Sequence, residues 1–322
     1  MARRVLHAVG GAAVGISAVL ISVLLLAACS PGDAPPTRES GSAEGAGDDR
    51  PLVLTTFTVL ADIAQHVAGD HLRVESLTKP GTEIHGYEPT PGDLRRAAGA
   101  DLIIDNGLGL EAWFEQFMHD LDAPHVVASD GVQVIDITGD EAAGLPNPHA
   151  WMSALEAQRY VENISAAFVE LDPEHADDYR HQAAAYTAEL QQVQGELLDA
   201  LHEVPAAQRV LVTCEGAFSY LARDAGLGEV SIWPVNAEQQ ATPRRIAAVI
   251  DAVRERAVPA VFCESTVSAD PMHRVVESSD ATFGGTLYVD SLSAADGPVP
   301  TYLALLRYNA QTIVSALTEV QE

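Results

Sequence analysis

The stretch DPEHADDYRHQAAAYTAELQQVQGELLDALHEV, residues 172–204, decides how the rest of the chain is organised. Its apolar or small side chains recur at alternating steps of three and four residues, which places them on one face of a helix. Asp172 is a candidate N-cap, Pro173 suits the first helical position, and Pro205 lies just past the end. These signals predict one helix, roughly 45 Å long. Because that length exceeds the diameter of a small domain, we expect this helix to join two lobes.

The chain on each side of this helix alternates β-rich runs with helical patterns. The main predicted strands are 52–57, 72–77 and 101–105 before the helix, and 209–214, 260–263 and 286–289 after it. Such alternation is typical of parallel sheets covered by helices. We therefore predict an α/β fold with two doubly wound parallel-sheet lobes, residues 51–171 and 205–322, joined by one long rigid helix. Ligands of open α/β sheets bind beyond the carboxyl ends of the strands, so we expect the site in the cleft between the lobes.

The N-terminal residues 1–28 have the features of an export signal. Arg3 and Arg4 precede an uncharged apolar run that ends in Leu-Ala-Ala before Cys29. This ending resembles the lipobox of bacterial lipoproteins, in which Cys29 would carry the lipid. An uncleaved membrane anchor is the alternative, because about 20 apolar residues can span a bilayer. Both interpretations place the remaining chain outside the cytoplasmic membrane, and Arg3-Arg4 would also suit twin-arginine export.

The composition of the remaining chain narrows the possible partners. Residues 29–50 are rich in Gly, Ser, Pro and acidic residues and lack Val, Ile, Leu and aromatic residues, so we expect a flexible tether. The formal charge of the full 322-residue chain, −28, argues against a nucleic-acid partner, which would require a basic surface. Cys214 and Cys263 are the two cysteines besides Cys29. In an oxidising compartment they are a candidate disulfide, and two buried thiols are the alternative.

Two of the eleven histidines stand in restrained loops rather than in helical patterns or at turns. His85 lies in GTEIHGYEPTP, residues 81–91, and His149 lies in NPHAW, residues 147–151. A lone histidine on a helix surface is seldom a ligand, whereas these two sit in proline-bounded loops next to predicted strands or helices. They are therefore the histidines that we consider as metal ligands.

The loops around these histidines resemble the metal-specific solute-binding lipoproteins of ABC importers, the zinc and manganese family. The resemblance rests on the segments HGYEPTPGD at 85–93, NGL at 106–108, PHAW at 148–151, EGAFSY at 215–220, ESTV at 264–267 and DS at 290–291. The motifs occur in the family's order from about Leu52 to the C-terminus. Each motif is weak alone, but their joint order is specific.

The resemblance implies one divalent ion between the lobes, held by His85, His149, Glu215 and Asp290. Both carboxylates follow predicted strands, as expected for a site beyond strand ends. Two imidazoles and two carboxylates neutralise a divalent cation, which lowers the cost of its burial. The resemblance also implies an ABC permease as partner, attachment through Cys29 to the outer face of the cytoplasmic membrane, and no enzymatic activity. We further expect a monomer.

The ligand types favour Mn²⁺. Zinc-specific members that resemble this chain usually have histidine where Glu215 stands, and an oxygen-richer site is better suited to Mn²⁺. Zn²⁺ is the next candidate and Fe²⁺ the last.

The family often has aspartate two residues before each histidine, and Glu83 and Asn147 stand at those positions here. We therefore expect the interactions that orient the two imidazoles to be weaker here, or to come from other groups.

Two further expectations concern the cysteines and the rival functions. The manganese-binding branch can carry cysteines at positions 214 and 263, so the resemblance implies a bridge beside Glu215. A metallohydrolase would need a general base and an open metal position, and the sequence offers neither. An adhesin, a label often attached to this family, remains as an alternative that makes no demand on the four ligands.

Overall fold

The computed structural model describes residues 48–118, 121–138, 142–235 and 241–318. The export signal, Cys29 and the tether up to residue 47 lie outside the described residues. Among the helices that are described, none has the length and apolar character needed to cross a membrane.

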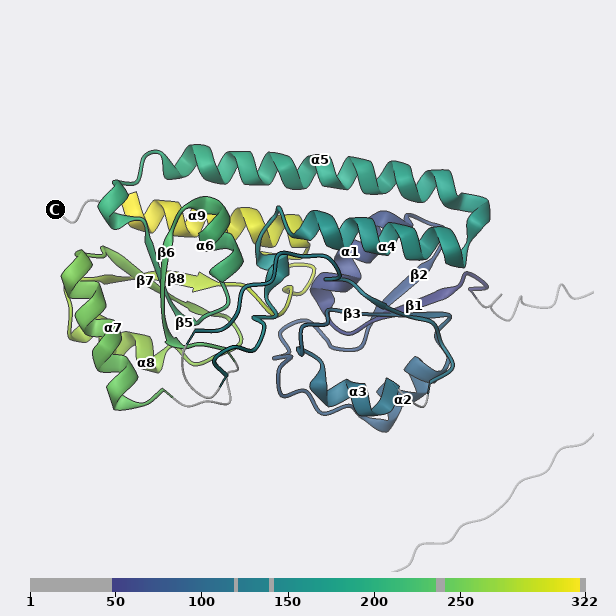
Figure 1. The fold of residues 1–322 in the computed structure, drawn as a ribbon, viewed down its shortest axis with the longest axis horizontal. Helices are drawn as coiled ribbons and strands as arrows, with labels where there is room; N and C mark the ends of the chain where they lie inside the picture. The colour runs from purple at the N-terminus through teal and green to yellow at the C-terminus, as the bar shows by residue number, and fades with distance from the viewer. Residues whose placement is uncertain (1–47, 119–120, 139–141, 236–240, 319–322) are drawn as a thin grey trace, which may run out of the picture. The chain divides into compact units, whose positions relative to one another are not determined.

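The first lobe is a four-stranded parallel sheet in the order β2-β1-β3-β4. Its strands are β1 (Leu52–Thr55), β2 (Arg73–Ser76), β3 (Leu102–Asp105) and β4 (His125–Val127). Its helices are α1 (Thr58–Ala68) and α4 (Ala157–Leu171) on one face and α2 (Pro91–Ala98) and α3 (Ala112–Met118) on the other (Figure 1). β1 and β3 are buried along their whole length, as expected for apolar strands of a parallel sheet.

The second lobe contains two parallel strand pairs that lie side by side. They are β5 (Val210–Glu215) with β6 (Gly228–Trp233), and β7 (Ala260–Glu264) with β8 (Thr282–Leu287). Its helices are α6 (Ser219–Ala225), α7 (Pro243–Arg256), α8 (Asp270–Glu277) and α9 (Tyr302–Thr318). Cys214 in β5 and Cys263 in β7 form a disulfide with their Cα atoms 4.9 Å apart. The bridge implied by the resemblance is therefore present.

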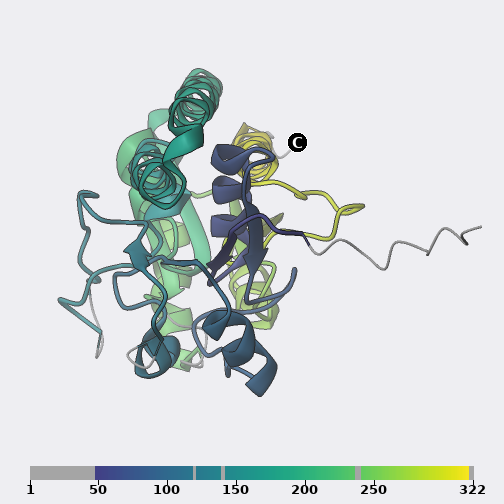
Figure 2. The same cartoon turned by 90° about the vertical axis from the view of Figure 1, so that its right-hand side faces the viewer.

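The long helix is α5 (Ala176–Leu201), and it runs across both lobes (Figure 1). It is shorter at both ends than the predicted 172–204. Pro173–His175 form a separate 3-10 turn, and the Asp172 side chain makes no capping bond to it. The apolar stripe of α5 is buried as the spacing predicts, and α1, α4 and α9 pack against this helix (Figure 2).

Contacts other than α5 also join the lobes. One hydrophobic core contains Leu102 of the first lobe, Leu190 of α5 and Phe262 of the second lobe. The carboxylate of Asp62 in α1 accepts hydrogen bonds from Tyr302 N at the start of α9 (2.9 Å) and from the Tyr186 hydroxyl in α5 (3.4 Å). The two predicted lobes are confirmed, and they share a continuous core as well as a connecting helix.

Candidate metal centre

The His85 loop is held by two carboxylates. Glu83 accepts hydrogen bonds from His85 N (2.7 Å) and Gly86 N (3.1 Å). Asp93 accepts from the hydroxyl groups of Tyr87 (2.9 Å) and Thr90 (2.7 Å), and it completes the capping box of α2. Burial opposes ionisation of Asp93, but hydrogen bonds from Arg96 and Thr90 lower its pKa to about 2. Acidic side chains therefore restrain the loop on both sides of His85.

His149 is oriented by the side chain of Asn147. Asn147 Oδ1 lies 3.1 Å from His149 N and 2.9 Å from His149 Nδ1, while Asn147 Nδ2 donates to Gly216 O at 2.7 Å. Because Nδ2 faces a carbonyl, the amide oxygen must face the imidazole, so Nδ1 of His149 is the donor. A neutral ring with the proton on Nδ1 presents the Nε2 lone pair to a cation.

Glu215 is the last residue of β5. Its backbone is restrained by Gly216, the next residue in the chain, and by Glu264 at the end of β7. Its N–H donates to both oxygens of Glu264, at 3.3 and 3.2 Å. A Cβ at Gly216 would lie 2.2 Å from Pro234 O, so only glycine fits directly after Glu215. The strand end thus fixes the backbone from which the buried Glu215 side chain extends.

Asp290 does not directly follow a strand, contrary to the prediction. β8 ends at Leu287, and Tyr288 and Val289 lie between the strand and Asp290. The loop is restrained by Trp151, whose Nε1 donates to Val289 O at 3.1 Å, and by Thr266, whose hydroxyl donates to Asp290 Oδ2 at 3.1 Å. Asp290 still reaches the same centre as Glu215.

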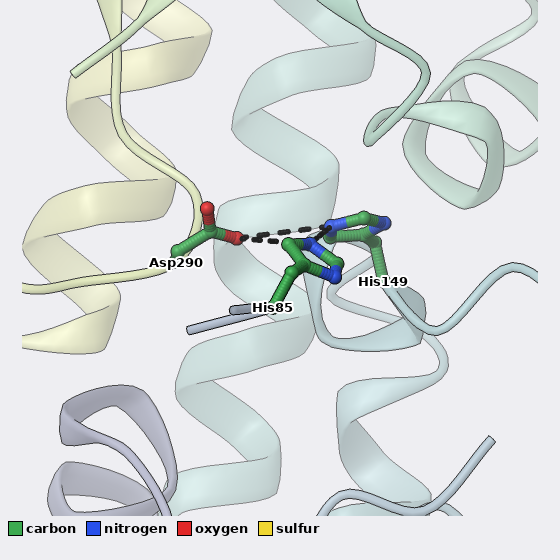
Figure 3. Close-up of side chains that lie close together, drawn as sticks. All are labelled: His85, His149 and Asp290. Carbon is green, nitrogen blue, oxygen red and sulfur yellow. Dashed lines mark hydrogen bonds and ion pairs between the residues drawn. The ribbon is translucent and has the colours of Figure 1, made fainter. Parts of the chain in front are cut away.

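The structure brings all four predicted ligands together. Figure 3 shows His85, His149 and Asp290 directed toward one another. The two histidine Nε2 atoms are 3.1 Å apart, and Asp290 Oδ1 lies 3.7 Å from Nε2 of His149 and 4.0 Å from Nε2 of His85. Glu215 Oε1 lies 3.5 Å from His85 Nε2. All four side chains are 6% exposed or less. His85, His149 and Asp290 therefore offer two nitrogens and one oxygen that lie within 4.8 Å of one another, and the Glu215 carboxylate lies beside His85.

The carboxyl groups around this point differ in their ionisation. Burial opposes ionisation of Asp290, but the neighbouring imidazoles of His149 and His85 hold its pKa below the ordinary value. Burial and the charge of Glu215 raise the pKa of Glu264 well above its ordinary value. Two carboxylates at this place can balance the charge of a divalent cation.

A hollow of about 450 Å³ adjoins the centre at His85. Its wall is mostly apolar and includes Leu108, Leu145, Pro148 and Val235. Leu108 has a positive φ of 56°, between two glycines that also have positive φ. The hollow therefore lies on the His85 side of the centre.

Known proteins are similar to this chain over most of its length. The family described as zinc-uptake complex component A, periplasmic, matches residues 53–316. The chain belongs to this family. It is a periplasmic metal-binding component of an ABC transporter for divalent metals, and members of the family are solute-binding transport proteins rather than enzymes.

Individual relatives are similar over most of their length. The iron-binding protein YfeA of Yersinia pestis is 50% identical over 262 residues, or 81% of this chain and 84% of YfeA. The manganese ABC transporter substrate-binding lipoprotein PsaA of Streptococcus pneumoniae is 32% identical over 287 residues, or 87% of this chain and 93% of PsaA. The solved structure of the Mn-bound periplasmic metal binding protein from Candidatus Liberibacter asiaticus has a TM-score of 0.78 and 36% identity, and the match covers 83% of this chain and 100% of that one.

Three residues that support the centre were not assigned a role from the sequence. Asn147 was noted only as a departure from the aspartate that is often found there, and the structure shows it orienting His149. Thr266 and Glu264 lie within the ESTV motif but far from the ligands in sequence. Their contacts to Asp290 and Glu215 depend on the pairing of β7 with β8 and on the position of β5 beside β7. No local spacing rule could have identified these contacts.

Proposed function

We propose that this protein captures Mn²⁺ outside the cytoplasmic membrane through His85, His149, Glu215 and Asp290 and delivers it to an ABC permease. The observation that carries the proposal is the buried cluster of the two Nε2 atoms with Asp290 Oδ1, beside which the Glu215 carboxylate lies 3.5 Å from His85 Nε2. Two anionic oxygen ligands make this centre harder than an imidazole-rich one, which favours Mn²⁺. A buried set of protein ligands that can fill the metal's coordination suits a carrier, whereas a catalytic metal needs an open position.

Fe²⁺ is the second candidate, and a specific observation favours it. The relative with 50% identity is an iron-binding protein, whereas the manganese-binding PsaA is 32% identical. Fe²⁺ also accepts mixed nitrogen and oxygen ligands. Zn²⁺ binds such ligands more tightly than either ion according to the Irving–Williams order, so affinity in purified protein does not identify the metal that is carried.

We further propose that Cys29 carries the lipid that holds the protein at the outer face of the cytoplasmic membrane, and that the protein is a monomer. Lipoprotein relatives support the anchor. The adhesin alternative predicts that the biological role survives loss of all four ligands. Alanine replacement of the four residues in the native host would distinguish the two functions through metal-dependent growth.

The test of the proposed site and metal has two parts. Anaerobic purification from the native host followed by metal analysis should give Mn²⁺ as the bound ion at one per chain. His85→Ala and Asp290→Asn should each lose binding of added Mn²⁺ in calorimetry, whereas His202→Ala, which changes an exposed histidine on the protein surface, should bind as the wild type does. Iron in the isolated protein would select the second candidate, and undiminished binding by His85→Ala would reject the site.

A further inference from the structure

We propose that Thr266 is a specificity-determining residue that limits Asp290 to one metal-ligating oxygen. The inference rests on the proposed metal site and names a residue that tunes which ions the site accepts. Thr266 touches the ligand Asp290 rather than the metal position itself. It is therefore a positioning residue, and its effect should differ between metals.

The two oxygens of Asp290 have different surroundings. Oδ2 accepts a hydrogen bond from the Thr266 hydroxyl at 3.1 Å. Oδ1 is buried without a hydrogen bond, and it is the oxygen that lies 3.7 Å from His149 Nε2 and 4.0 Å from His85 Nε2. One oxygen is thus held by the protein, and the other faces the point where the imidazole nitrogens converge (Figure 3).

The fold fixes the position of the Thr266 hydroxyl. β7 and β8 are parallel neighbours whose last residues, Glu264 and Leu287, are paired. Ser265 N continues the ladder by donating to Leu287 O at 2.9 Å. Thr266 and Asp290 then leave the same sheet edge within a few residues of each strand end. The strand pairing therefore brings the backbones of Thr266 and Asp290 close together, and the side-chain hydroxyl of Thr266 reaches Asp290 Oδ2 from there.

The number of oxygens that Asp290 offers affects metal ions differently. With Oδ2 held by Thr266, the site supplies His85 Nε2, His149 Nε2, Asp290 Oδ1 and the carboxylate of Glu215. A small ligand number suits Zn²⁺, which is usually four-coordinate. Mn²⁺ prefers more ligands and more oxygen, and a carboxylate can bind a cation through both oxygens. The Thr266 hydroxyl therefore reduces the preference of the site for Mn²⁺ over Zn²⁺.

The test compares three variants in metal competition. Thr266→Val removes the hydroxyl while keeping the shape, Thr266→Ser keeps the hydroxyl, and Ser265→Ala removes a neighbouring hydroxyl that does not contact Asp290 Oδ2. Affinities for Mn²⁺ and Zn²⁺ are measured separately against a chelator. Loss of a partner that supports a ligand typically changes metal affinity about 10-fold or more. We expect Thr266→Val to lower the ratio of Zn²⁺ to Mn²⁺ affinity by about 10-fold, and the other two to keep it.

The second readout is the metal coordination itself. X-ray absorption of the Mn²⁺-loaded Thr266→Val protein should show more oxygen ligands than the wild type, because Oδ2 becomes available. A ratio that stays within about twofold of the wild-type value, or an unchanged coordination number, would overturn the inference. Circular dichroism of the metal-free protein shows whether Thr266→Val folds. If it does not fold, Thr266→Ala takes its place.

The outcomes also separate this inference from the proposed function. If His85→Ala binds Mn²⁺ as the wild type does, the proposed site is wrong and the role of Thr266 falls with it. If His85→Ala loses binding while Thr266→Val and Thr266→Ser both keep the wild-type ratio of Zn²⁺ to Mn²⁺ affinity, the proposed site stands and only the role of Thr266 is rejected.

Discussion

At His149, an uncharged amide holds the ring nitrogen that faces away from the centre. An aspartate at this position would act as a charged acceptor. Asn147 instead accepts from Nδ1 with its oxygen and donates to Gly216 O with its nitrogen. This second bond connects the orientation of a first-lobe ligand to the residue that follows Glu215 in the second lobe. One side chain therefore couples ligands from both lobes.

Replacement of Asn147 should weaken metal binding more than it weakens folding. Asn147→Ala removes the acceptor of His149 Nδ1, so the imidazole can rotate and the proton can move to Nε2. We expect a loss of about 10-fold or more in Mn²⁺ affinity, measured by calorimetry. Asn147→Asp keeps an acceptor oxygen and is the matched control, which should retain most of the affinity. Equal affinities of the alanine variant and the wild type would show that packing alone orients His149.

Glu111 gives a residue-scale prediction about stability and pH. Its buried carboxyl accepts hydrogen bonds from Thr56 Oγ1 (2.7 Å), Asn106 N (2.7 Å) and Gly107 N (3.2 Å). Burial, with the charge of Asp105, raises its pKa from 4.5 to about 8. Between these values the folded protein keeps a proton that the unfolded chain releases. The contribution of Glu111 to the free energy of unfolding is therefore fully present below the pKa of the unfolded chain. It is lost as the pH rises toward the pKa in the folded protein.

The matching experiment compares Glu111→Gln with the wild type. Glutamine resembles the protonated acid, so the variant lacks this pH dependence. Between about pH 5 and pH 8, we expect wild-type stability to fall relative to the variant by up to about 1.4 kcal/mol per pH unit. Urea unfolding at several pH values measures the difference. Parallel stability curves for the two proteins would mean that Glu111 stays ionised in the folded state.

At the level of elements, the Cys214–Cys263 bridge joins β5 to β7 beside Glu215 and Glu264. It closes a segment with a sequence separation of 49 residues. The double replacement Cys214→Ala with Cys263→Ala should lower the free energy of unfolding by about 2–4 kcal/mol, because the unfolded chain loses a constraint. Denaturation in urea measures this, with the reduced wild type as control. If the oxidised and reduced wild-type proteins have the same midpoint, the bridge does not stabilise the fold.

The elements also show what the sequence could predict. The apolar stripe of α5 gave its position and its buried face, but Asp172 and Pro173 could not reveal that the first turn is a separate 3-10 turn. β6 (Gly228–Trp233) was missed, because its first four residues are only partly buried and include Glu229 and Ser231. β8 was placed too late, because Gly284 and Gly285 weaken its β signal while Tyr288 and Val289 strengthen the signal beyond its end.

The site was predictable only in part for a related physical reason. The four proposed ligands come from four loops or strand ends between residues 85 and 290, and only folding brings them together. The resemblance to a family supplied the set, and general rules for parallel sheets supported the positions of the carboxylates. The hydrogen bond from Asn147 to Gly216 O joins the two lobes, and the bond from Thr266 to Asp290 joins the ends of neighbouring strands. Such contacts are absent from any local pattern.

At the scale of the described molecule, the lobes are connected on more than one side of the centre. Ser291, next to Asp290, accepts from Gly81 N in the His85 loop at 2.7 Å. Tyr220 of α6 donates to Asn147 O at 2.7 Å, next to the loop of His149. These bonds add to the continuous core and to α5, which packs against helices of both lobes. A large rotation between the lobes would break all of these contacts together.

We therefore predict only a small change in shape when the metal binds. A continuous helix resists bending, and hinge closure needs a few residues that absorb a large backbone change between otherwise separate bodies. Metal release should instead involve rearrangement of the His85 loop or of the second-lobe carboxylates. Solution scattering of metal-free and Mn²⁺-loaded protein should give the same radius of gyration within error. The non-binding variant Asp290→Asn, treated with the same Mn²⁺, controls for salt effects. Compaction of the wild type alone would show that α5 bends and that the bonds between the lobes open.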